Sequence, residues 1–117
     1  ARLKDIRRGP QKGGGERIVF DLESLGGSAD DVPFFQVNIN PEESRLIVSL
    51  WADVTYEHDP ARVDSAFKSS PRVKGVSVLP RIEDGMATIE LPLKASQLVK
   101  VEAFYLTHPA RIILDLL

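Results

Sequence analysis

The stretch FYLTHPARIILDL at residues 104–116 decides the fold, because the earlier stretch VNINPEESRLIVSL at residues 37–50 follows the same plan. In both, a strand-like run meets a turn containing proline. The chain then returns as arginine, three apolar residues, one polar residue and leucine. The first copy has two more residues between its proline and its arginine, which predicts a longer turn there. Similar order in two places predicts an internal duplication.

A second pair of runs supports this duplication. ERIVFDL at residues 16–22 and GMATIEL at residues 85–91 both follow a glycine-containing turn, and both end with an apolar residue, an acidic residue and leucine. Each half is therefore expected to be a hairpin followed by a hairpin, with the halves at about residues 3–56 and 72–117.

Alternating apolar and polar residues predict about eight strands. The run from Arg45 to Tyr56 is unusually long, and an unbroken strand of that length would extend roughly 40 Å. We therefore expect a bend or bulge inside it. The other expected strands span residues 3–8, 17–22, 33–39, 73–79, 86–93, 99–106 and 111–116.

One short helix is expected in the connection at residues 59–70. Asp59 is a suitable N-cap residue and Pro60 suits the first helical position. The apolar side chains at i, i+3 and i+4, which are Val63, Ala66 and Phe67, would share one face of this helix. A four-stranded unit with one apolar face cannot bury that face alone. The sequence thus predicts a single domain, residues 1–117, with a mainly all-β fold of two packed sheets.

Composition excludes several classes of protein. The chain has 117 residues, 43% of them hydrophobic and 27% charged, which is typical of a globular domain. Its formal net charge of −2 gives no basic field for nucleic acid. It has no cysteine, and no apolar run of about 18 residues that would predict membrane insertion.

Catalytic patterns are also missing. No serine lies in a G-x-S-x-G setting, and the glycines at residues 13–15 lack the Lys-Ser/Thr of a phosphate loop. His58 and His108 are far apart in the sequence, which is a poor basis for a metal site. We expect no catalytic residue, no metal and no cofactor, so the chain is not expected to be an enzyme.

The order of these elements resembles the AMIN domain, the β-rich module of bacterial N-acetylmuramoyl-L-alanine amidases and of secretins. LTHPARIILDL at residues 106–116 matches the closing Leu-x-x-Pro-x-Arg motif of that family, and RIVFDL at residues 17–22 matches the earlier motif. The chain departs from the pattern in the turn at residues 40–45, at Met86, and in the helical insert at residues 60–70.

This resemblance implies a non-catalytic module of the periplasm or cell envelope. Such a module binds peptidoglycan, through its glycan strands or stem peptides, and localises its parent protein to the cell wall. The alternative is a protein–protein interaction module of an envelope assembly, such as a secretin or pilus system, that pairs through an exposed sheet edge.

Trp51 is the first candidate for ligand binding. On an extended strand it shares a face with Arg45 and Asp53, so an exposed indole flanked by polar groups could stack on a sugar ring. The alternative is that the helix or the opposite sheet covers Trp51, and that Arg45 and Asp53 are only part of a solvated surface.

Arg111 occupies the position in the second half that Arg45 occupies in the first. Arginine binds carboxylates in a bidentate manner, and peptidoglycan carries carboxylates. Within the chain, Asp115 or Asp21 could instead pair with Arg111 and fix the hairpin register. Since the first half carries the only tryptophan, we expect it to contribute more to recognition and the second half more to the fold.

Overall fold

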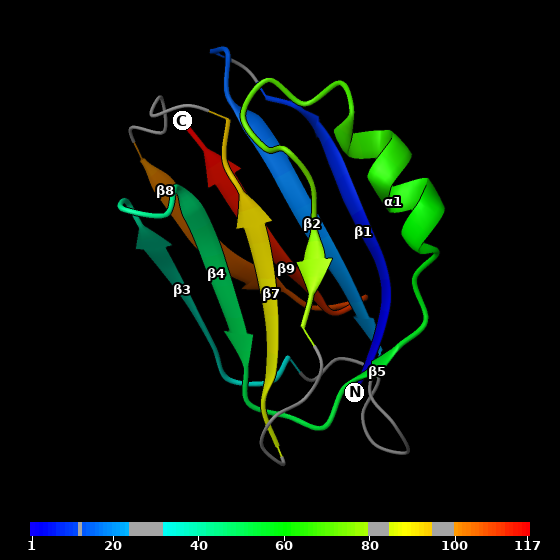
Figure 1. The fold of residues 1–117 in the computed structure, drawn as a ribbon. Helices are drawn as coiled ribbons and strands as arrows, with labels where there is room; N and C mark the ends of the chain where they lie inside the picture. Colours follow the sequence, from blue (N-terminus) through cyan, green and yellow to red (C-terminus); the bar gives the residue numbers. More distant parts are fainter. Residues whose placement is uncertain (12, 24–31, 80–84, 95–99) are drawn as a thin grey trace.

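The computed structural model describes residues 1–11, 13–23, 32–79, 85–94 and 100–117, and this part of the chain forms nine strands and one helix (Figure 1). One sheet has the strand order β5–β1–β2–β9–β8 and the other the order β3–β4–β7–β6. The prediction of a mainly β, two-sheet sandwich with one short helix is confirmed. The elements are β1 (Arg2–Pro10), β2 (Glu16–Glu23), β3 (Phe35–Asn40), β4 (Arg45–Leu50), β5 (Thr55–Tyr56), α1 (Pro60–Phe67), β6 (Ser77–Val78), β7 (Ala87–Pro92), β8 (Val101–Leu106) and β9 (Arg111–Leu116).

The two sheets have the same plan. Between the two halves, β1 corresponds to β6, β2 to β7, β9 to β4 and β8 to β3. With these replacements, the order β1–β2–β9–β8 of the five-stranded sheet becomes β6–β7–β4–β3, which is the order of the four-stranded sheet. Each sheet thus combines the first hairpin of one half with the second hairpin of the other. The central contacts β2–β9 and β4–β7 both join the two halves.

The central pairs differ in register by two residues. Arg111 lies opposite Asp21, whereas its counterpart Arg45 lies opposite Pro92, two residues beyond Glu90. Glu90 is the counterpart of Asp21 in the repeat. Because side chains alternate with a period of two, this shift keeps every apolar residue on the core side.

The core lies between the inner faces of the sheets. On β2, β4 and β7 the inward positions are buried and the outward positions half-buried, which follows the alternation in the sequence. The largest fully buried side chains come from both sheets and the helix: Leu3, Ile6, Ile18, Phe20, Leu46, Leu50, Phe67, Ile89, Leu91, Ile112, Leu114 and Leu116.

The long strand predicted at residues 45–56 is divided in two. β4 ends at Leu50, and β5 lies in the other sheet, where it pairs in parallel with β1. The chain therefore crosses between the sheets at residues 51–54. The expected bend is a complete change of sheet. The alternation of apolar and polar residues does not show that the chain continues along the edge of β1.

Two smaller predictions are also corrected. The strand expected at residues 73–79 is reduced to β6 and an isolated bridge between Val73 and Leu93. The two proline turns are equally long, because four residues separate Asn40 from Arg45 and four separate Leu106 from Arg111. Proline simply occupies the first position of one turn and the third position of the other.

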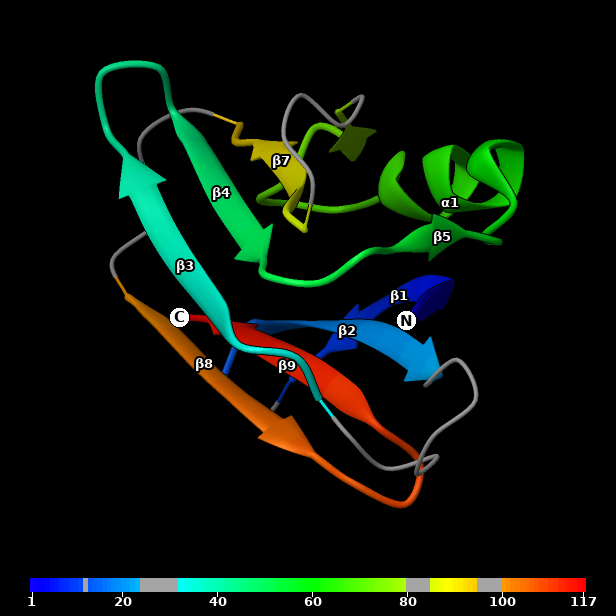
Figure 2. The same ribbon diagram turned by 90° about the horizontal axis from the view of Figure 1, so that it is seen from below.

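The helix forms where the sequence predicts it. Asp59 accepts hydrogen bonds from the backbone N–H groups of Ala61 and Arg62, and Pro60 begins the helix. Val63 and Phe67 are buried. Viewed end on, α1 and β5 lie on one side of the sandwich while β3 and β8 lie on the other (Figure 2).

A buried polar network joins the end of the helix to the first hairpin. The Glu16 side chain is almost completely buried; it accepts hydrogen bonds from Ser70 Oγ at 2.7 Å and from Arg8 Nε at 2.5 Å. Arg8 also approaches the carbonyl oxygen of Ala66. Ser70 Oγ in turn accepts from the backbone N–H of Val73. Since a buried carboxylate without partners is costly, this network fixes the helix against β1 and β2.

We expect Ser70→Ala to lower the free energy of unfolding by about 1–3 kcal/mol, because it removes a donor to a buried carboxylate. Denaturant unfolding followed by circular dichroism measures this change. Ser65→Ala is the matched control, since Ser65 is exposed on the helix, and it should change stability by less than about 0.5 kcal/mol. Equal effects of the two substitutions would contradict the role assigned to the network.

Candidate functional site

The outer face of the four-stranded sheet gathers hydrogen-bonding side chains. On β4 the buried residues alternate with the outward-facing Arg45, Ile47 and Ser49. The strand register places β3 and β7 residues beside each of these in rows across the sheet. The rows are Gln36–Ser49–Thr88, Asn38–Ile47–Glu90 and Asn40–Arg45–Pro92.

An aromatic pair continues this face beyond the last row. The backbone N–H of Trp51 donates to the carbonyl oxygen of Phe34 at 2.9 Å, which extends the β3–β4 ladder by one pair. Their rings lie 5.2 Å apart with an interplanar angle of 54°. Trp51 is 42% exposed and Phe34 is 65% exposed. Of the two interpretations of Trp51, the exposed one agrees with the structure, since more than a third of the residue is accessible to solvent.

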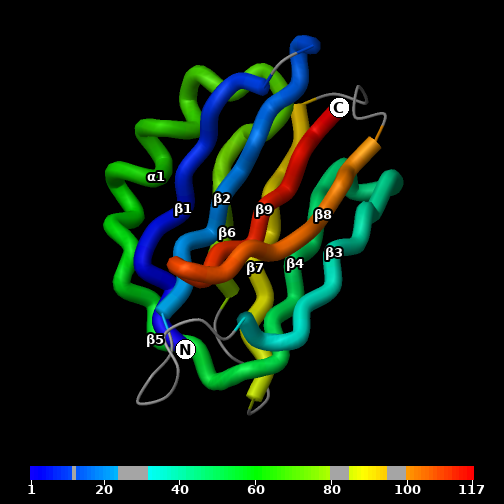
Figure 3. The backbone as a smooth tube through the Cα atoms, turned by 180° about the vertical axis from the view of Figure 1, so that it is seen from behind, coloured from blue at the N-terminus to red at the C-terminus, as the bar shows by residue number. Residues whose placement is uncertain are grey.

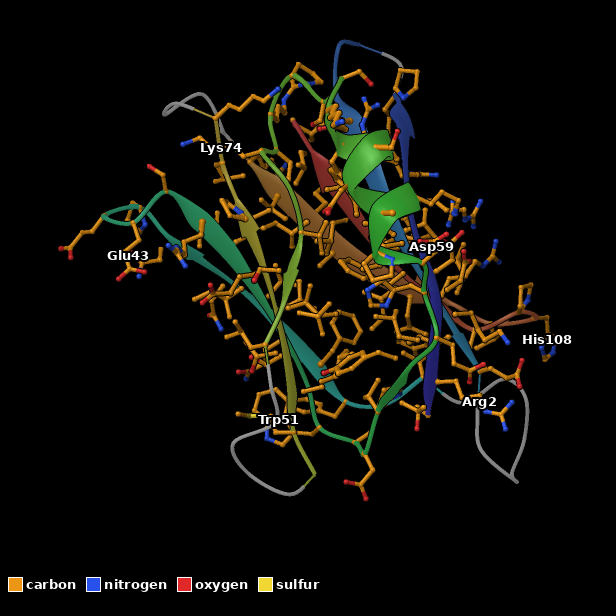
Figure 4. All side chains as sticks on the ribbon, turned by 45° about the vertical axis from the view of Figure 1, so that its right-hand side comes forward. Arg2, Glu43, Trp51, Asp59, Lys74 and His108 are labelled. Atoms are coloured by element: carbon orange, nitrogen blue, oxygen red, sulfur yellow. The ribbon has the colours of Figure 1, made fainter. Side chains whose placement is uncertain are left out.

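Arg45 lies at the other end of β4 from Trp51. Its Nη1 is 2.5 Å from the Glu90 carboxylate, and its Nε is 3.4 Å from that of Glu43. Figure 4 shows Trp51 at the opposite end of the sheet from the turn that carries Glu43. The guanidinium is therefore already paired with acids, and a ligand carboxylate at this point would have to share it.

Asp53 lies outside this face. It follows the end of β4, and its carbonyl oxygen accepts a hydrogen bond at 2.8 Å from the backbone nitrogen of Ala1. The interpretation that Asp53 shares a strand face with Arg45 and Trp51 was wrong, because it depended on one unbroken strand to Tyr56.

Asp115 and Arg111 lie on the outer side of β9, since the alternate residues Ile112, Leu114 and Leu116 belong to the core. Figure 3 shows β9 between β2 and β8 in the five-stranded sheet. Asp115 is only 4% exposed and accepts two hydrogen bonds from Arg17, at 2.8 and 2.9 Å, and one from Gln11 at 3.2 Å. Within the described residues, Arg111 forms neither expected ion pair, since Asp115 pairs with Arg17 and Asp21 with Arg7. Its Nε donates instead to the carbonyl oxygen of Pro109 at 3.0 Å.

The Arg17–Asp115 contact is a structural one. The hydrogen bonds from Arg17, supported by the one from Gln11, hold the pKa of Asp115 below its usual range despite its burial. The same contact raises the pKa of Arg17. Arg17 also lies over the ring of Phe104, with 5.6 Å between the guanidinium carbon and the ring centre. The ion pair thus ties β2 to β9 at the junction of the two halves.

The five candidate residues therefore do not form one site. Arg45 and Trp51 share the outer face of the four-stranded sheet, while Arg111 and Asp115 belong to the other sheet and Asp53 to neither face. Phe34 was not foreseen, although the hairpin register predicts it: counting outward from the pair Asn40–Arg45 places Phe34 opposite Trp51.

A groove lies beside the aromatic pair, between the edges of β3 and β8. Its volume is about 540 Å³. The rings of Phe35 and Tyr105 meet edge to face across it, with their centres 6.5 Å apart. It is lined by Val32, Pro33, Phe34, Phe35, Ala103, Phe104 and Tyr105.

No protein-family model, curated protein or solved structure matches the chain. Among the described residues, no helix has the length and apolar character to cross a membrane. No group of three or more His, Asp or Glu side chains in the same residues is close enough to hold a metal ion.

We expect Asp115→Asn to lower the free energy of unfolding by about 2 kcal/mol at neutral pH, because it removes a charged partner of Arg17 from a mostly buried site. The pKa of Asp115 is lower in the folded state than in the unfolded state. Its contribution is thus fully present above the unfolded value of about 3.9 and is lost as pH falls through the lower folded value.

Denaturant unfolding at several pH values tests this expectation. The difference between wild type and Asp115→Asn should shrink below about pH 4. A difference that stays constant down to the lowest pH would show that charge on Asp115 is not what stabilises the fold.

Proposed function

We propose that this domain is a non-catalytic, AMIN-like module of the cell envelope that binds peptidoglycan and localises its parent protein to the cell wall. The observation that carries the proposal is the exposed Phe34–Trp51 pair at the end of a sheet face rich in amide and hydroxyl side chains. The resemblance of the sequence motifs to the AMIN family supports the choice of polymer and of compartment.

The chemistry of the face suits a glycan. Aromatic rings offer a flat apolar surface to the C–H groups of a sugar ring. The amides of Gln36 and Asn38 and the hydroxyls of Ser49 and Thr88 both donate and accept hydrogen bonds, as sugar hydroxyl and acetamido groups require. Successive outward positions on one strand are about 7 Å apart, so several rows would contact more than one sugar ring.

Single-site affinity is expected to be weak. An open sheet face leaves much of each sugar hydrated, and binding restricts both the polymer and the side chains. Retention on a cell wall would then depend on many sites along the polymer.

Trp51→Ala should raise the dissociation constant for insoluble peptidoglycan sacculi about tenfold, the equivalent of about 1.4 kcal/mol, because it removes half of the aromatic pair. The measurement is a pelleting assay in which the protein left in the supernatant is quantified against the amount of sacculi. Phe34→Ala should act in the same direction.

Tyr105→Ala is the matched control. Tyr105 is 58% exposed but lies on β8, in the other sheet. This variant should pellet like the wild type. Wild-type protein that stays in the supernatant would contradict peptidoglycan binding, and loss of binding in Tyr105→Ala alone would move the site to the groove.

A second candidate is a protein–protein interaction module of an envelope assembly. The apolar groove between β3 and β8, with two strand edges along it, is the observation that favours it. On this alternative the domain leaves sacculi unbound, and substitutions in the groove rather than on the sheet face abolish capture by its partner.

A further inference from the structure

The edge of β3 differs from the other sheet edges. β5 and β6, which end the sheets on the opposite side, have two residues each. β8 carries Glu102, whose carboxylate pairs with Lys100 at 3.1 Å. β3 has six residues, FQVNIN, with no charge and no proline, and its register with β4 is continuous. Proteins usually protect an edge with charges, prolines, bulges or short strands, and β3 has none of these protections.

The ladder shows which backbone groups of β3 are free to pair. Because Trp51 donates to Phe34, residues 34 and 51 are a hydrogen-bonded pair, and the even-numbered residues of β3 direct their N–H and C=O groups toward β4. Phe35, Val37 and Ile39 therefore direct theirs away from β4, toward the open edge.

The side chains of β3 are self-complementary. Phe35, Val37 and Ile39 point to the core side, yet Ile39 is 48% exposed because the edge leaves it uncovered. Gln36 and Asn38 point outward and are exposed. If β3 met a second β3 in antiparallel orientation, apolar residues would face apolar residues and amides would face amides, with no charge brought against another.

We propose that a second copy of this chain docks antiparallel along the edge of β3, with the twofold axis at Val37. This register places Val37 opposite the partner's Val37 and Phe35 opposite the partner's Ile39, so the free backbone groups meet one another. It also overlaps residues 34–40 completely. The four-stranded sheets of the two copies become one continuous sheet.

The dimer also changes the glycan-binding face, and this consequence rests on the proposed function. In the same register Phe34 lies opposite the partner's Asn40, which neighbours the partner's Arg45. Neighbouring strands are about 4.8 Å apart, and three such spacings place Trp51 about 14 Å from the partner's Arg45. Within one copy, six residues along the strand place Trp51 about 20 Å from Arg45. The aromatic pair of one copy and the arginine of the other then form one row across the sheet, in which a sugar carboxylate would share Arg45 with Glu90.

Sedimentation velocity over a range of concentrations tests the dimer, with Val37→Pro as the diagnostic variant. Proline removes an N–H that faces the open edge and leaves the ladder to β4 intact. We expect the wild type to shift toward dimer as concentration rises and Val37→Pro to remain monomeric. Thermal unfolding verifies that the variant is folded.

Ala103→Pro is the matched control. Lys100 and Leu117 donate to each other's carbonyl oxygens, which directs the N–H of Ala103 to the open edge of β8. This variant should dimerise like the wild type. A wild type that is monomeric at every concentration, or a Val37→Pro that dimerises equally well, would overturn the proposal.

Cysteine cross-linking tests the register, since the chain has no cysteine of its own. Gln36 would lie opposite the partner's Asn38 in a non-hydrogen-bonded pair, with about 4.5 Å between Cα atoms, which a disulfide can span. A mixture of Gln36→Cys and Asn38→Cys proteins should give the mixed disulfide under mild oxidation, far more than either variant gives alone. Equal yields from all three samples would exclude this register.

These measurements use no peptidoglycan, so their outcome is independent of sacculus binding. The shared row has its own test: Val37→Pro should pellet with sacculi less than Ala103→Pro. Equal pelleting by a monomeric Val37→Pro would refute the shared row and leave the dimer unaffected.

Discussion

The fold depends on the pairing of the two halves through β2–β9 and β4–β7. Each hairpin has one apolar face, and a single hairpin or an isolated half cannot remove that face from water. Because each sheet takes one hairpin from each half, the pairs that complete the sheets also enclose the core. The Arg17–Asp115 ion pair lies on one of these junctions and the Arg45–Glu90 contact on the other.

Much of the fold could be predicted from the sequence because strand periodicity and capping residues act locally. β9 has the predicted bounds, and the helix begins at Pro60 behind its Asp59 cap. The change of sheet after Leu50 could not be predicted, since apolar and polar residues alternate without interruption from residue 45 to residue 56. The division depends on pairing with distant strands: residues 45–50 pair with β3 and β7, whereas residues 55–56 pair with β1. The two-residue difference in register was equally hidden, because it keeps the same faces buried.

The candidate site was less predictable than the fold. Trp51 was identified from its strand face, but its partner Phe34 becomes visible only when the hairpin is counted from its turn. Asp115 has the residue type of a ligand-binding group. It is buried and paired with Arg17, so its carboxylate stabilises the β2–β9 junction instead. The two outer faces have diverged accordingly: one presents the exposed aromatic pair and a row of neutral polar groups, and the other is covered by arginine–carboxylate pairs.

The interleaved strand order also has an evolutionary consequence. If each half descends from one ancestral segment, that segment could have completed a sheet only by taking its second hairpin from another molecule. The ancestor would then have been an obligate homodimer of short chains with exchanged hairpins. Gene fusion would have converted this dimer into a single chain and freed each sheet to acquire its own surface chemistry, which is what the unlike faces of the present domain display.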